Sequence, residues 1–163
     1  MNTQRLKMPV VTLLPAFVAF LIMQACGGSD SAIAQDAADP FEGVWESVVT
    51  QRDCTTSAAV GTFLGAQVYH RGGTLGDTNA SPTATRGPGF GTWVKNGSTY
   101  STKFRFYVYD ASGAVSGVTR ASGTVTLGAD AKTSTTTVSN QLFDLNGNVL
   151  RSGCATAVST RAP

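Results

Sequence analysis

The sequence predicts an all-β protein, a single antiparallel up-and-down barrel of about eight strands, with a β-sandwich as the alternative. From Phe41 onward the chain is rich in Thr, Val, Gly, Ala and aromatic residues and contains no isoleucine, which favours pleated sheet over helix. Short runs are separated by Gly or Asn turns, and no segment has a convincing helical period. This is the pattern of hairpin-connected strands, and closing them into a ring removes exposed edges.

The expected strands follow one another through local turns. Two-residue hairpin signals stand at Asn96-Gly97 and Asn146-Gly147. The stretch 76–91 contains two prolines and several glycines, so we expect a long loop or an edge segment there. The predicted strands are 41–49, 59–69, one that opens at Trp93, 100–109, 115–127, 135–143 and 149–157.

The strand predicted over 100–109 has two chemically different faces. Phe104, Phe106 and Val108 alternate with a cationic and tyrosine-bearing face, and a barrel turns one of the two inward. The simpler interpretation places the phenylalanines inside. In the alternative, the other face lines a polar cavity suited to an anionic or hydroxylated small molecule. Its candidate ligand-binding residues are Arg105, Tyr107 and Tyr109.

Two cysteines, Cys54 and Cys154, stand near opposite ends of the predicted domain. In an exported protein an even pair of thiols usually forms a disulfide, so we expect these two to be joined. The bridge would connect the first strand to the last. A zinc site is the alternative, but two cysteines with the single His70 match no usual zinc spacing.

The N-terminus has the features of an export signal. Arg5 and Lys7 precede an apolar run over 10–22, which is too short for a mature membrane-spanning helix. The run ends at Ala25-Cys26, which resembles the lipobox of bacterial lipoproteins, although Met23 and Gln24 depart from its usual pattern. We therefore expect a signal peptide over 1–25, a flexible tether over 26–40 and a β-barrel domain over 41–163.

The lipobox resemblance implies that acyl chains on Cys26 attach the protein to a membrane surface. Gly27 after this cysteine resembles the outer-membrane sorting pattern of Gram-negative bacteria. The expected location is the cell envelope. The alternative is cleavage after Ala34, which would remove the cysteine and release a secreted or periplasmic protein.

At the head of the first predicted strand, Gly43-Val44-Trp45 resembles the G-x-W motif of lipocalins and related calycin barrels. In that family the tryptophan packs across the closed end of the barrel and is covered by an arginine after the last strand. Arg161 stands at the corresponding place. The resemblance implies barrel-end packing between Trp45 and Arg161. More broadly, the chain resembles uncharacterised exported bacterial proteins.

Composition argues against several functional classes. Of the 12 basic side chains two lie in the signal, which leaves ten against ten acidic ones, so no electrostatic footprint for nucleic acid is present. Acids, bases and nucleophiles form no catalytic motif, and the glycine-rich 86–91 precedes no helix that could present its N-terminus to a phosphate. We expect no enzyme, cofactor or metal.

The leading expectation is a non-enzymatic cell-envelope lipoprotein whose barrel binds a small apolar ligand or a partner protein. The alternative is a structural or inhibitory interaction module with a filled barrel, making contact through 76–91. An enzyme that uses the barrel interior ranks third.

Overall fold

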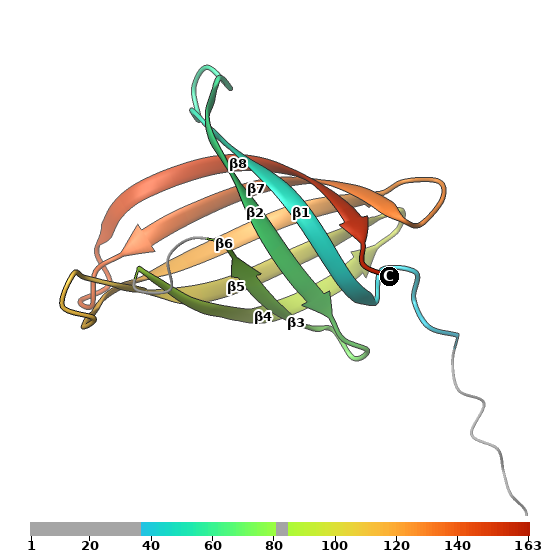
Figure 1. Cartoon of the computed structure of the whole chain (residues 1–163), viewed down its shortest axis with the longest axis horizontal. Helices are drawn as coiled ribbons and strands as arrows, with labels where there is room; N and C mark the ends of the chain where they lie inside the picture. The colour runs from blue at the N-terminus through green and yellow to red at the C-terminus, as the bar shows by residue number, and fades with distance from the viewer. Residues whose placement is uncertain (1–36, 81–84) are drawn as a thin grey trace, which may run out of the picture. The chain divides into compact units, whose positions relative to one another are not determined.

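The computed structural model describes residues 37–80 and 85–163, and these residues form a closed antiparallel barrel (Figure 1). Each strand pairs with the next along the chain, and the last pairs with the first. The up-and-down barrel predicted from the sequence is confirmed, and within the described residues no helix is found. The predicted signal peptide and residues 26–36 of the tether lie outside the described residues.

Eight strands make up the described barrel. Their bounds are β1 Gly43–Arg52, β2 Ala59–Tyr69, β3 Thr74–Asn79, β4 Arg86–Asn96, β5 Thr99–Tyr109, β6 Val115–Leu127, β7 Thr133–Phe143 and β8 Val149–Arg161.

The stretch predicted as a long loop, 76–91, is largely strand. Most of β3 and the first part of β4 fall within it, which corrects that expectation. Pro88 is exposed and lies where the β4–β5 register shifts, between Arg86 and Gly89, so its missing N–H interrupts no regular ladder. Gly91 faces the β5 backbone so closely that a Cβ there would lie 1.9 Å from the Lys103 carbonyl oxygen. Glycine and proline therefore shape this strand and do not end it.

One end of the barrel, called here the capped end, holds the hydrophobic core. Phe41 and Trp45 are fully buried there, and Phe41 stacks on the Tyr100 ring with their centroids 4.3 Å apart. The core also includes Tyr69, Leu75, Trp93 and Val125. These residues come from strand ends that meet at one rim, so the capped end is packed solid.

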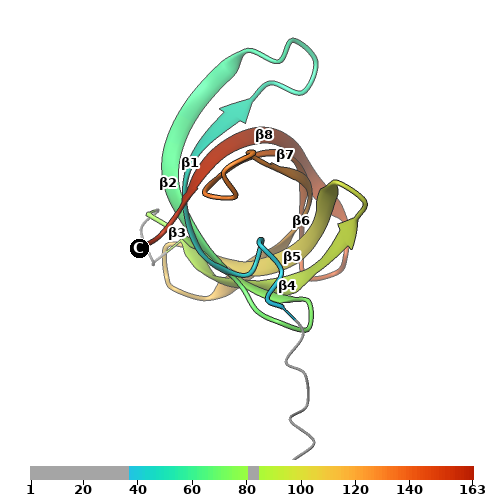
Figure 2. The same ribbon diagram turned by 90° about the vertical axis from the view of Figure 1, so that its right-hand side faces the viewer.

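The segment before β1 forms the cap itself. In the view along the ring, it lies across the opening (Figure 2). The Asp39 carboxylate accepts hydrogen bonds from the Phe41 N–H at 2.9 Å, from the Tyr100 hydroxyl at 2.7 Å and from Lys95 Nζ at 2.9 Å. These hydrogen bonds hold the segment before β1 in place, so that its Phe41 ring points into the core at the capped end.

The β1–β2 hairpin extends beyond the wall of the barrel (Figures 1 and 2). This follows from strand lengths, because β3 pairs with β2 only over Gly65–Tyr69. The part of β2 nearer the turn has β1 as its paired neighbour. On the other side of the hairpin, β1 remains paired with β8 as far as Arg52.

Candidate functional site

The end of the barrel opposite the cap has a different interior. Here the large apolar side chains on inward-facing positions are half-buried, whereas most of those at the capped end are buried, with Phe104 and Leu127 half-buried against them. In a closed barrel an inward side chain can be exposed only to the interior or to the mouth. We call this region the distal lumen. Its apolar lining residues are Val49, Phe106, Val108, Val138 and Leu142.

Small residues line the wall between the distal lumen and the capped end. A Cβ added at Gly65 would point toward Val49 and Gln67, and one added at Gly153 would meet the Asn140 side chain at 2.8 Å. Both glycines therefore occupy inward positions that hold no side chain. Other small inward residues are Gly123, Ala121, Ala155 and Ala157. Such a wall leaves more interior volume than a wall of large side chains.

A chain of polar side chains follows the inner wall from β8 through β1, β2 and β3 to β4. The hydroxyls of Ser159 and Ser47 are 2.7 Å apart. Ser47 Oγ donates to Gln67 Oε1 at 2.7 Å, and Gln67 Nε2 donates to Asp77 Oδ1 at 3.0 Å. Arg86 Nη2 then donates to Asp77 Oδ2. Five strands thus contribute to one connected network beneath the distal lumen.

The ion pair that ends this network is well shielded from solvent. The side chains of Arg86 and Asp77 are 10% and 6% exposed. Burial raises the pKa of the Asp77 carboxyl above its ordinary value, although the charge and hydrogen bonds of Arg86 and the bond from Gln67 act against the rise. Burial, together with the Asp77 charge, also raises the pKa of Tyr69. Burial therefore disfavours the ionised form of both groups, and for Asp77 the partners Arg86 and Gln67 offset this cost only in part.

Arg86 also contacts the apolar part of the lumen. Its guanidinium carbon lies 3.8 Å from the centroid of the Phe106 ring, a cation–π contact. Its Nε is buried and has no hydrogen-bond partner. The residue therefore joins the polar network on one side and the half-buried Phe106 on the other.

The alternative that placed the cationic and tyrosine-bearing face of 100–109 inside is wrong. Arg105 is exposed and Tyr107 is 50% exposed, so both lie on the outer wall. Tyr109 is half-buried, and its ring lies next to Gly87. The inward positions belong to Phe104 and Phe106, because burying aromatic rings is more favourable than burying unpaired cations.

Trp45 and Arg161 lie together at the capped end. The Arg161 guanidinium carbon is 4.7 Å from the centroid of the Trp45 ring. The guanidinium also donates to the carbonyl oxygens of Glu42 and Pro40, in the segment before β1. Trp45 Nε1 donates to the Phe41 carbonyl at 3.0 Å. Arg161 thus fastens the end of β8 to the cap and covers the buried indole.

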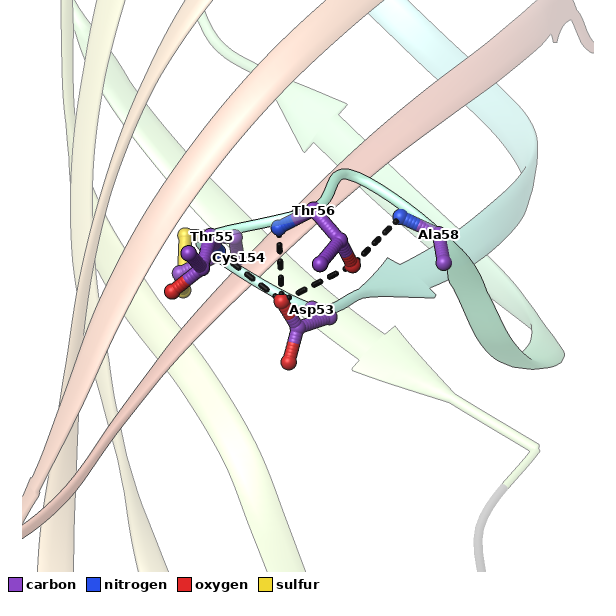
Figure 3. Close-up of a disulfide and its surroundings, with 6 residues drawn as sticks. Asp53, Thr55, Thr56, Ala58 and Cys154 are labelled. Carbon is purple, nitrogen blue, oxygen red and sulfur yellow. Dashed lines mark hydrogen bonds between the residues drawn. A yellow bond between two sulfur atoms is a disulfide. The ribbon is translucent and has the colours of Figure 1, made fainter.

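Cys54 and Cys154 are joined as a disulfide, with their Cα atoms 5.2 Å apart (Figure 3). The adjoining turn is organised by Asp53, whose Oδ1 accepts from the Thr55 and Thr56 N–H groups at 2.9 and 2.7 Å. These bonds lower the pKa of Asp53. The bridge attaches the turn of the β1–β2 hairpin to β8.

Two further recesses lie outside this network. One of about 560 Å³ is lined largely by outward side chains of β1, β2 and β8, among them Val48, Leu64 and Val158, each more than half exposed. The other, of about 530 Å³, is lined by β5–β8 and the β1–β2 turn. Neither includes Arg86 or Asp77.

Sequence reasoning missed the roles of Arg86 and Asp77. It assigned both to the predicted loop 76–91, where a charged side chain indicates no particular role. The available signal was the alternation Leu75, Asp77, Asn79, which gives β3 an inward face. The predicted absence of a role for His70 stays a prediction; its ring is exposed just after β2, and its backbone carbonyl accepts from Trp93 Nε1 at 3.0 Å.

Within the described ranges, no three His, Cys, Asp or Glu side chains gather in a way that could hold a metal ion. No helix in this part of the chain has the length and apolar character needed to cross a membrane. Cys26 and Ala34, the two predicted processing positions, lie outside the described residues.

Neither a protein family nor a curated protein matches this chain. Among solved structures, the crystal structure of Rv2717c from M. tuberculosis is similar over 77% of this chain and 94% of that chain, with 14% sequence identity and a TM-score of 0.38. The assignment of the barrel rests on the strand pairing described above.

Proposed function

We propose that this protein is a non-catalytic binding protein whose distal lumen holds a small, mainly apolar molecule. The observation that carries the proposal is the contrast between the two ends of the interior: most large inward apolar side chains at the capped end are buried, whereas those of the distal lumen are half-buried. Barrel mouths are common sites for small molecules, and such sites combine apolar walls with a few polar groups.

The lining of the distal lumen supports the same proposal. Phe106, Val108 and Leu142 offer apolar contact area, while glycine and alanine positions leave room between them. A molecule that covered these side chains would remove apolar surface from water, which is the main source of affinity for apolar ligands.

The test is to fill the lumen and measure binding. Val138 faces inward between Gly123 and Ala155, whereas its neighbour Thr137 is exposed on the outer wall. We expect Val138→Trp to weaken binding of the neutral apolar dye Nile red by at least about tenfold, which corresponds to ~1.4 kcal/mol. The matched variant Thr137→Trp should bind the dye like the wild type.

Circular dichroism in the near ultraviolet establishes that both tryptophan variants are folded. Native mass spectrometry of protein purified without detergent gives a second measurement, because a resident ligand adds mass that Val138→Trp loses. Wild-type protein that binds neither the dye nor a resident molecule would overturn the proposal. Equal dye affinity in the two folded variants would do the same.

We further propose that the protein is exported and acylated at Cys26, which would place the barrel at a membrane surface of the cell envelope. The support is the cationic start, the apolar run over 10–22 and the cysteine that follows Ala25. Metabolic labelling with a fatty acid should mark the wild type and leave Cys26→Ala unlabelled. If both carry equal label, or if the mature chain begins at Gln35, the acylation proposal is wrong.

A further inference from the structure

Arg86 carries one N–H group that no described residue accepts. Its side chain is 10% exposed and its Nη2 is bonded to Asp77, but Nε is buried without a partner. Almost all buried donors in folded proteins are hydrogen-bonded, so an unpaired one calls for a specific explanation. A ligand atom that accepts a hydrogen bond from this N–H group would provide that explanation.

The surroundings of Arg86 place this donor beside the distal lumen. The guanidinium stacks on Phe106, and Arg86 is paired in register with Val108. Both Phe106 and Val108 are half-buried lining residues. The neighbouring inward position Gly89 carries no side chain that could cover the guanidinium. An apolar molecule lying against Phe106 would therefore have its end near Nε.

The charge balance decides which kind of acceptor fits. Asp77 compensates the charge of Arg86, and the groups that continue the network, Gln67, Ser47 and Ser159, are uncharged. Arg151 also occupies an inward position, opposite Leu142 near the start of β8, but it is exposed, so solvent screens its charge. A carboxylate ligand at Arg86 would bring a second negative charge next to Asp77 without a buried cation to match it, which is unfavourable in a poorly solvated interior. A ketone, ester, amide or hydroxyl oxygen can accept the hydrogen bond without bringing a second negative charge.

We infer that the distal lumen selects an apolar molecule bearing an uncharged oxygen, which accepts a hydrogen bond from Arg86 Nε. This inference rests on the proposed function, since it names the class of ligand that the lumen takes. Phe106 contacts the apolar part of the ligand, and the Arg86–Asp77 pair provides a neutral polar end.

Three probes of similar chain length separate these possibilities: octane, methyl octanoate and octanoate. Displacement of Nile red near neutral pH measures the affinity of each. We expect the ester to bind about tenfold more tightly than the alkane, the effect of one net hydrogen bond. Octanoate should bind more weakly than the ester because of its charge.

Arg86→Lys isolates the contribution of Nε. Lysine keeps the positive charge opposite Asp77 but has a methylene in place of the Nε–H group. This variant should lose the preference for the ester over octane. The control Arg105→Lys, on the outer wall of the neighbouring strand, should keep that preference.

A second measurement does not depend on the variant folding. In wild-type protein labelled with ¹⁵N, the Arg86 Nε–H resonance should shift on addition of methyl octanoate and remain in place with octane. If the probes displace Nile red but octanoate equals the ester, or the Nε–H resonance ignores the ester, the inference is overturned while the proposed function stands. If no probe and no dye binds, the proposed function itself fails.

Discussion

Arg86 and Asp77 are a pair of opposite charges inside a barrel whose wall is otherwise mostly apolar or neutral in that region. Each holds its charge because the other compensates it, and Gln67 satisfies the second carboxylate oxygen. Removing one partner would leave a buried charge unpaired, which is far more costly than removing both. Single and double substitutions of this pair should therefore have non-additive effects on the free energy of unfolding.

We expect Arg86→Met to lower the free energy of unfolding by about 3–5 kcal/mol, because it leaves the Asp77 carboxylate buried without its cation. The double variant Asp77→Asn with Arg86→Met should lose much less, since the asparagine carbonyl can still accept from Gln67. Urea denaturation of the two single variants and the double variant measures the coupling. Simple additivity of the two single losses would contradict the buried pair.

At the scale of single elements, aspartate side chains organise the turns between strands. Asp110 Oδ1 accepts from the Ser112 and Ala114 N–H groups, and Asp144 Oδ1 accepts from those of Asn146 and Asn148. These hydrogen bonds, with those from the Ser112 hydroxyl and the Asn148 amide, lower the pKa of both carboxyls. Each hairpin therefore closes on an ionised side chain.

The free energy of unfolding should fall as the pH drops through and below about 4, the ordinary pKa of an unfolded aspartate. The lowered pKa values of Asp110 and Asp144 mean that the folded state releases protons that the unfolded chain takes up, so their stabilisation is present above this range and lost below it. Urea unfolding over a pH series tests this. Replacing both with asparagine should flatten the acid slope.

Asp77 provides a control of opposite sign. Its pKa is raised by burial, so folding favours its protonated form, and its contribution to stability improves as the pH falls. Asp77→Asn should therefore make the acid slope steeper. An unchanged slope in the turn variants, or a flatter one in Asp77→Asn, would contradict these assignments.

At the scale of the whole molecule, closure of the barrel depends on β1 meeting β8. Their ladder runs from Trp45–Arg161 to Arg52–Cys154, and Cys154 of its last pair forms the disulfide with Cys54. The two cysteines are 100 residues apart. A covalent link across so long a loop greatly restricts the unfolded chain, and thereby favours the closed barrel.

Replacing both cysteines with serine should reduce the free energy of unfolding by up to about 4.7 kcal/mol, the value that the chain-entropy relation assigns to a loop of this length. Urea denaturation of the oxidised wild type and the double serine variant measures the difference. Thiol titration of the denatured, unreduced wild type should detect neither Cys54 nor Cys154. Two reactive thiols, or equal stability of the two proteins, would contradict the bridge.

The sequence by itself determined the class of fold, the approximate positions of β1, β2 and β5 to β8, and the pairing of the two cysteines in the predicted domain. Alternation of side chains and Asn-Gly turns are local signals, because strand period and turn conformation depend on a few neighbouring residues. They also favoured the correct orientation of Phe104 and Phe106, since burial of aromatic rings is the lower-energy choice.

Only the tertiary structure decided that 76–91 contains parts of two strands and that Arg86 meets Asp77 beneath the distal lumen. The glycines and Pro88 resemble a loop when considered along the chain, but they fit strands once the neighbours β2 and β5 supply hydrogen bonds and close packing. In the buried network, Gln67, Asp77 and Arg86 lie on successive strands, whereas Ser47 and Ser159 are 112 residues apart and meet only when β1 pairs with β8. The alternation in β3 could indicate an inward Asp77, but the contact between Ser159 and Ser47 depends on closure of the whole barrel.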